Sequence, residues 1–214
     1  MPITTSMTTR FKMDILFGRH HFGQSRTFTA TGTSTQTWTG VSSLTGIAVG
    51  AFLSGTNIAA DTRVADILSA NSIYVSKPST GAISTVTVVG DTYMIALFRA
   101  SISGVYGAAT NSYADMTAEE TTGTGYTAGG QALTNVDPAI SGTTAFTDFS
   151  PDPTWTSASF STAGCMIYNS TQNGDLANAA CSVHDFGGTQ TVTSGTFTAV
   201  MPTADASNAI LRIA

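Results

Sequence analysis

The sequence has little charge, very little lysine and no long apolar segment. Of its 214 residues, 10% are charged and only Lys12 and Lys77 are lysines, whereas 38 residues are threonine. Ordinary soluble domains are about 25% charged. Threonine is β-branched and suits a half-exposed strand, and a hydroxyl surface packs against other chains without desolvating charge. The composition therefore indicates a strand-rich component of an assembly, and it points to no reaction.

Three classes of partner or location are disfavoured by what the chain lacks. The net charge of −5 disfavours nucleic acid, because phosphate binding needs a basic patch. No apolar run reaches the roughly 18 residues of a membrane span. Residues 1–5 show neither the basic nor the apolar region of a secretion signal, so we expect synthesis in a cytoplasm.

The order of apolar and polar residues predicts an all-β protein. Short alternating segments, such as residues 36–41 and 84–89, are separated by Gly, Ser, Asn and Pro, as in small sandwiches and barrels. We expect two small β-sandwich or barrel units with an extended N-terminal arm. The predicted boundaries are an arm over residues 1–25, a small Ig-like β domain over residues 26–92 and a C-terminal β-sandwich over residues 93–214.

A short internal similarity gives a second hypothesis for the domain order. Residues 13–17, Met-Asp-Ile-Leu-Phe, resemble residues 94–98, Met-Ile-Ala-Leu-Phe. If these two segments lie together, the first β unit is an insertion into the second.

The N-terminal segment has the pattern of an attachment element. A threonine-rich start is followed by an apolar run and a Gly-bounded loop, a combination that is poorly suited to burying itself alone. We expect residues 1–25 to order on assembly, with a strand that adds to a neighbouring chain or to its own domain. The residues of this predicted attachment strand are Phe11, Met13, Ile15, Leu16 and Phe17.

The two cysteines lie on either side of a turn pattern. Asn173–Gly174 favours a hairpin, and position 173 is midway between Cys165 and Cys181. Strands that pair around that turn would place the two thiols opposite each other, where a disulfide is geometrically possible. The alternative is two buried, reduced thiols.

No catalytic, metal-binding or cofactor-binding residues are predicted. Adjacent residues of a strand face opposite sides, so neither His20–His21 nor His184–Asp185 makes a convincing metal site or acid–base pair. Glu119 and Glu120 fall in a polar segment and are expected to be solvated. We therefore expect a protein that is not an enzyme.

Two stretches resemble proteins of tailed-bacteriophage particles. Residues 41–50 followed by 53–58 are similar to a module common in phage virion proteins, with Asn57 where a glycine is usual; Asn tolerates positive φ. The second stretch resembles a β domain of phage structural proteins over most of residues 94–214. It is carried by residues 123–130, 153–156, 167–169, 185–187 and 202–210.

This resemblance implies a non-enzymatic structural component of a virion, made in the host cytoplasm. The expected role is a capsid decoration or cement protein that binds the major capsid protein and forms a homo-oligomer, with a trimer as one possibility. The alternative is a neck, tail or fibre-associated virion protein that binds a host-surface glycan. In that case Trp38, Trp155 and the tyrosines of the loop over residues 106–130 would contact the sugar.

Overall fold

The protein is built almost entirely of antiparallel strands, which confirms the all-β class expected from the sequence. The computed structural model describes residues 2–171 and 175–214, and within them the helices are α1 (Thr9–Leu16) and the 3-10 helix η1 (Tyr113–Glu119). Neither of these helices is long and apolar enough to cross a membrane. The chain divides into two compact units: residues 21–90 form one, and residues 1–20 with 91–214 form the other.

Residues 21–90 form a six-stranded sheet that closes on itself. Its order is β2-β7-β4-β5-β6-β3, and all pairs are antiparallel. Thr31, two residues after β2, and Thr39, the last residue of β3, exchange backbone hydrogen bonds of 2.7 and 2.9 Å. This pairing closes the sheet, so the unit is a small barrel rather than the expected Ig-like two-sheet sandwich. Closure leaves no unpaired strand edges, which such short strands would otherwise expose. The strands are β2 (Arg26–Thr29), β3 (Thr37–Thr39), β4 (Phe52–Ser54), β5 (Thr62–Ser69), β6 (Ser72–Val75) and β7 (Thr85–Val89).

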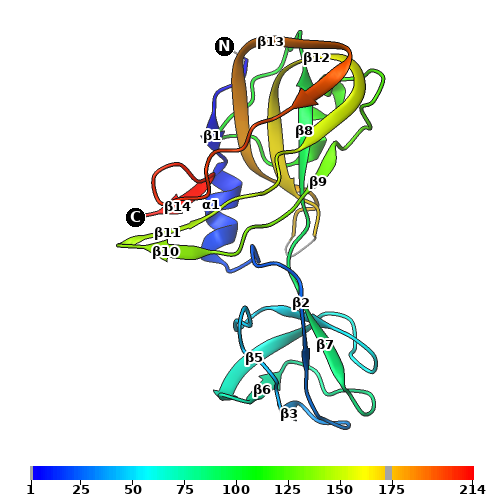
Figure 1. Cartoon of the computed structure of the whole chain (residues 1–214), viewed down its shortest axis with the longest axis vertical. Helices are drawn as coiled ribbons and strands as arrows, with labels where there is room; N and C mark the ends of the chain where they lie inside the picture. The colour runs from blue at the N-terminus through cyan, green and yellow to red at the C-terminus, as the bar shows by residue number, and fades with distance from the viewer. Residues whose placement is uncertain (1, 172–174) are drawn as a thin grey trace. The chain divides into compact units, whose positions relative to one another are not determined.

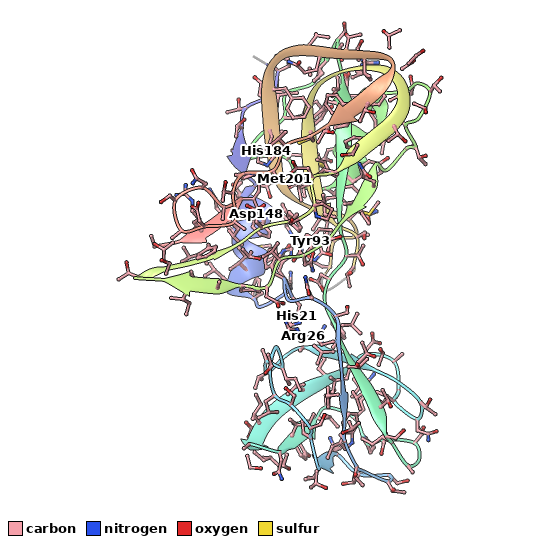
Figure 2. The ribbon with its side chains drawn as sticks, viewed as in Figure 1. His21, Arg26, Tyr93, Asp148, His184 and Met201 are labelled. Carbon is pink, nitrogen blue, oxygen red and sulfur yellow. The ribbon has the colours of Figure 1, made fainter. Side chains whose placement is uncertain are left out.

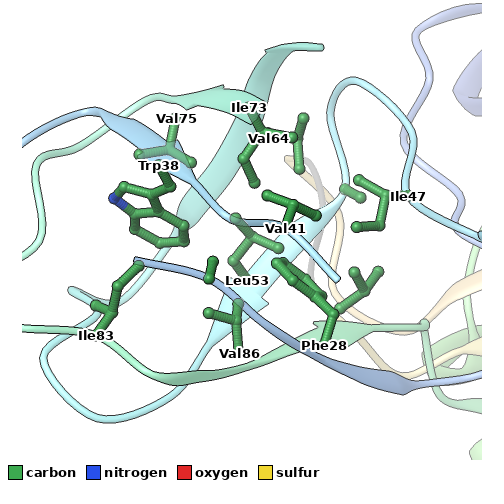
Figure 3. Close-up of a cluster of buried hydrophobic side chains, with 13 residues drawn as sticks. Phe28, Trp38, Val41, Ile47, Leu53, Val64, Ile73, Val75, Ile83 and Val86 are labelled. Carbon is green, nitrogen blue, oxygen red and sulfur yellow. The ribbon is translucent and has the colours of Figure 1, made fainter. Parts of the chain in front are cut away.

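The barrel encloses an apolar core that its alternating strands supply (Figure 3). Trp38 and Ile73, which are cross-strand partners on β3 and β6, are fully buried. The Trp38 indole donates a hydrogen bond of 3.0 Å to the Thr35 carbonyl, so its polar atom is satisfied. Asn57 has a φ of 63°, as expected for the residue that replaces glycine in this turn.

The second unit contains a five-stranded sheet of order β1-β13-β12-β8-β9. Two of its strands are long and curve together, as Figure 1 shows. Strand β8 is buried along most of its length, as its continuous apolar run predicts. The strands are β1 (Ser6–Met7), β8 (Tyr93–Arg99), β9 (Gln131–Leu133), β12 (Thr154–Asn169) and β13 (Ala179–Thr198).

One face of this sheet carries the core of the second unit. Ala96 and Phe98 on β8, with Met166 and Tyr168 on β12, pack with residues of β13 and with Met116 of η1. The intervening residues face the other side of the sheet. A separate three-stranded sheet has the order β10-β11-β14, with β10 (Ala139–Ser141), β11 (Thr144–Thr147) and β14 (Leu211–Ile213).

The N-terminal segment is not an extended arm, and the predicted attachment strand is wrong. Strand β1 pairs with β13, and the run that begins at Arg10 lies in α1. The Thr8 side chain caps the helix by accepting the Phe11 N–H at 3.1 Å, and it donates to the Ala180 carbonyl at 2.6 Å. Ile3 and Phe11 are 1% and 3% exposed, so the segment is folded onto its own unit.

Residues 21–90 are inserted into the other unit, which is formed by residues 1–20 together with 91–214, but the internal similarity between residues 13–17 and 94–98 does not reflect paired segments. Residues 94–98 are part of β8, whose strand partners are β12 and β9. Residues 13–16 belong to α1, whose main contacts are with β13.

We expect residues 21–90 to unfold cooperatively when expressed alone, because their sheet and core are complete within the unit. Trp38 is the fragment's only tryptophan, so its fluorescence reports denaturant unfolding. Ile73→Ala should lower the free energy of unfolding by about 2–5 kcal/mol. Leu68→Ala, at a position 51% exposed, should change it by about 0.5 kcal/mol or less. A broad, non-cooperative transition of the fragment would contradict this expectation.

Candidate functional site

An exposed apolar stripe runs along the outer face of α1. Met13, Leu16 and Phe17 stand at positions i, i+3 and i+4, which lie on one side of a helix, and they are 39%, 88% and 63% exposed. We call these three residues the helix stripe. Phe11, on the opposite side of the helix, is buried, and Ile15 is half-buried. Of the five residues predicted for attachment, three are therefore presented to the outside, by the helix and by its C-cap residue Phe17 rather than by a strand.

The helix is held in place by a cluster of ion pairs. The buried Asp14 carboxylate accepts from Arg10 Nε at 2.6 Å and from Arg19 Nη1 at 3.0 Å. Both arginines also reach Asp175 Oδ1, at 2.5 and 2.9 Å. Hydrogen bonding to Arg10 lowers the pKa of Asp175 to about 2. The two arginines thus fasten the helix to the connection between β12 and β13.

A second polar cluster lies around His20. The His20 Nδ1 atom is 3.2 Å from the Tyr93 hydroxyl and 3.1 Å from Asn169 Nδ2, which also donates to Asp91 Oδ2 at 2.8 Å. The Phe11 ring packs edge-on against the imidazole, with ring centroids 4.6 Å apart. Burial lowers the pKa of His20 to about 4, so the ring is neutral at pH 7 and its Nδ1 can accept the hydrogen bond from Asn169. His21 belongs to the other unit.

The two cysteines are free thiols rather than a disulfide. On the paired strands Cys165 lies opposite His184, three positions from Cys181. An irregularity between Ile167 and Tyr168 contributes to this offset, because Ile167 pairs with Ser182 whereas Tyr168 pairs with Ala180. The pairing that was centred on residue 173 is therefore displaced; residues 172–174 themselves lie outside the described residues. Both thiols are buried, and burial raises the pKa of Cys165 to about 12.

The polar segment before β9 is ordered by two buried carboxylates, not solvated ones. Glu120 is 8% exposed and accepts from the Tyr113 hydroxyl at 2.5 Å, the Tyr126 hydroxyl at 2.6 Å and the Gly129 N–H at 2.7 Å. Glu119, 6% exposed, pairs with Arg99 Nη2 at 2.6 Å. The hydroxyls of these two loop tyrosines therefore donate hydrogen bonds to a buried carboxylate.

Of the expected sugar-binding aromatics, the two tryptophans and Tyr106 are buried, and Tyr113 and Tyr126 are half-buried. Trp38 and Trp155 are 0% and 5% exposed, and Tyr106 is 7% exposed with its hydroxyl bonded to the Asp115 carbonyl. Trp155 packs among Tyr126, Phe160 and Phe197. These rings build the core and offer no exposed platform for a glycan.

A second exposed apolar set, which the sequence pattern did not predict, crosses the three-stranded sheet. Ile140 on β10 is opposite Ala145 on β11, and Ala145 is opposite Ile213 on β14. Ile140 and Ile213 are 79% and 57% exposed. We call these residues the sheet row. Its only sequence signal was the apolar centre of residues 139–141, flanked by small residues.

Comparison of the chain with models of known protein families, with curated proteins and with solved structures finds no match.

Replacing Asp14 should loosen α1. Asp14→Asn removes a buried carboxylate from two guanidinium groups, and such a loss costs about 3 kcal/mol of unfolding free energy. Asp175→Asn changes a side chain that is 68% exposed, so its effect should be smaller. Urea unfolding measures both, and hydrogen exchange of residues 9–16 locates the change. Equal effects of the two variants would contradict a clamp centred on Asp14.

Acid should destabilise the second unit because His20 is buried in its neutral form. The pKa of folded His20 is about 4 and the unfolded value is 6.5, so the unfolded chain binds more protons between these pH values. The unfolding free energy should fall as pH drops from 6.5 to 4, by up to about 3 kcal/mol from this residue. His20→Gln should reduce that slope in urea titrations at several pH values. An unchanged slope would refute the assignment.

Proposed function

We propose that the chain is a non-enzymatic structural component of a tailed-phage particle, a decoration or cement protein that binds the major capsid protein. The observation that carries the proposal is the helix stripe, an exposed apolar surface on a firmly held helix. The resemblance of residues 41–58 and 94–214 to phage virion proteins is the reason for proposing a phage particle as the assembly. The protein would be made in the host cytoplasm and would work in the virion.

The helix stripe suits a contact with another protein. Contiguous exposed apolar side chains mark interaction sites, whereas single exposed ones are ordinary. Phenylalanine and methionine are enriched in interfaces, where they fill the partner's surface. Because ion pairs of Arg10 and Arg19 already fix the helix, little conformational freedom is lost on binding.

The composition of the surface supports lateral contacts between many chains. Only 10% of the residues are charged and 38 are threonine, so adjacent subunits would bury hydroxyl and apolar groups rather than ions. The sheet row supplies a second apolar contact, which fits a homo-oligomer, a trimer included, on the shell. Such an assembly should depend only weakly on salt. Neither nucleic acid nor membrane is part of this proposal.

The direct test changes the helix stripe and counts the protein in particles. Leu16→Glu with Phe17→Glu should reduce incorporation at least tenfold, because charge would be buried in the contact. The control is Val105→Glu, which changes a side chain 85% exposed in the same unit. Quantitative gels of purified particles compare each variant with the major capsid protein, and circular dichroism confirms that both variants fold.

Two results would contradict the proposal. Normal incorporation of the double variant would exclude the helix stripe as the attachment site. A wild-type copy number of six or twelve, rather than hundreds, would place the protein at the neck or tail instead of the head.

A further inference from the structure

The second unit contains an apolar cleft that no part of the proposed assembly uses. It lies between the face of the large sheet opposite the core and the segment over residues 199–210, and its volume is about 370 Å³. From the sheet, Ile95, Ile167 and Phe186 line it, together with Cys165 and His184. The opposite wall is formed by residues 199–202 and 208–210.

The wall that covers the sheet is fixed by carboxylates outside the cleft. Asp152 accepts the Met201 N–H at 2.9 Å, and the buried Asp148 accepts the Ile210 N–H at 3.0 Å. Between these points Asp205 accepts the N–H groups of Ser207 and Asn208, at 2.7 and 2.8 Å. Figure 2 labels His184, Met201 and Asp148 in this part of the unit. The cleft is therefore preformed, as ligand sites usually are.

One polar group on the sheet side has spare hydrogen-bonding capacity. His184 Nε2 is 2.8 Å from the Ser182 hydroxyl, and Nδ1 has no hydrogen-bond partner among the described residues. Burial lowers the pKa of His184 to about 4, so the imidazole is neutral at pH 7. Neutral imidazole offers one hydrogen bond from Nδ1, as donor or acceptor according to its tautomer.

The uncharged lining of the cleft disfavours anions. None of its lining residues carries a charge at pH 7. The charged groups that fasten its outer wall, the carboxylates of Asp148, Asp152 and Asp205 and the guanidinium of Arg212 on the Ser207 carbonyl, are not among the lining residues. A ligand that enters the cleft must leave water, and an anion would do so without a cation in the lining to receive it.

The volume sets the size of the occupant. An apolar cavity of roughly 150 Å³ holds one benzene ring. A cleft of about 370 Å³ has room for two fused rings or a short branched chain.

We infer that this cleft is a binding site for an uncharged, largely apolar small molecule of bicyclic size, with one group that hydrogen-bonds to His184. The site is distinct from the helix stripe and the sheet row, and the inference does not rest on the proposed function. It adds small-ligand binding to a protein proposed to be structural.

The probe for this site is 6-propionyl-2-(dimethylamino)naphthalene, a neutral bicyclic fluorophore with one carbonyl. Titrated into the full-length protein at pH 7, it should bind saturably at one site per chain with blue-shifted emission. The anionic probe 8-anilinonaphthalene-1-sulfonate should bind at least tenfold more weakly. His184→Phe keeps the ring but removes the hydrogen bond, and it should weaken the neutral probe about tenfold.

Two further variants locate the site. Val200→Trp places a large ring at a lining position that is 79% exposed, so folding is little affected, and the ring is large enough to cover the opening of the cleft. It should abolish saturable binding, whereas Val105→Trp, an exposed position elsewhere in the unit, should leave binding unchanged. In the wild type, the probe should also slow hydrogen exchange over residues 199–210.

Absence of saturable binding to the wild type would overturn the inference and would leave the cleft as a contact for a partner's side chain. Binding that survives Val200→Trp, without protection of residues 199–210, would also overturn it, as would equal affinity for the anionic probe.

Discussion

The placement of α1 depends on one buried carboxylate. An eight-residue helix is too short to be stable by itself in water. Asp14 supplies the missing stability by receiving Arg10 and Arg19, while the Thr8 cap and buried Phe11 fix the start of the helix. With Phe11 and Asp14 facing inward, the geometry of the helix turns the helix stripe outward. The proposed attachment surface is thus a consequence of how the helix is fastened.

Buried carboxylates also hold other segments of the second unit that lie outside its sheets. The chain has only 13 acidic residues, yet Asp14, Glu119, Glu120 and Asp148 are all buried. Each accepts hydrogen bonds that tie an irregular segment down: the helix, the loop before β9 or the segment ahead of β14. A chain with little charge therefore uses part of it internally, which leaves threonine and apolar groups to dominate the surface.

The fold class could be predicted from the sequence, because alternation and turn residues are local. The helix could not, since the burial of Asp14 and the contacts of Arg10 with Asp175 and of Thr8 with Ala180 join it to residues far along the chain, which its own pattern does not reveal. The cysteine pairing failed because Asn169 pairs with Ala179, two positions past the partner that a turn centred on residue 173 would give, and the irregularity between Ile167 and Tyr168 adds one more position. Tyr113 and Tyr126 were expected to be exposed because a glutamate in a polar segment, such as their partner Glu120, is usually on the surface. Its burial is visible only in the folded structure.

The central claim is that the helix stripe contacts another virion protein in the assembled particle. A photo-crosslinking residue introduced as Leu16→p-benzoylphenylalanine tests this contact directly in purified particles, with Val105→p-benzoylphenylalanine as the exposed control. Irradiation should join the Leu16 variant to the major capsid protein or to a second copy of the chain, as identified by mass spectrometry, and should leave the control unjoined. A Leu16 variant that incorporates normally but forms no intermolecular product would contradict the account.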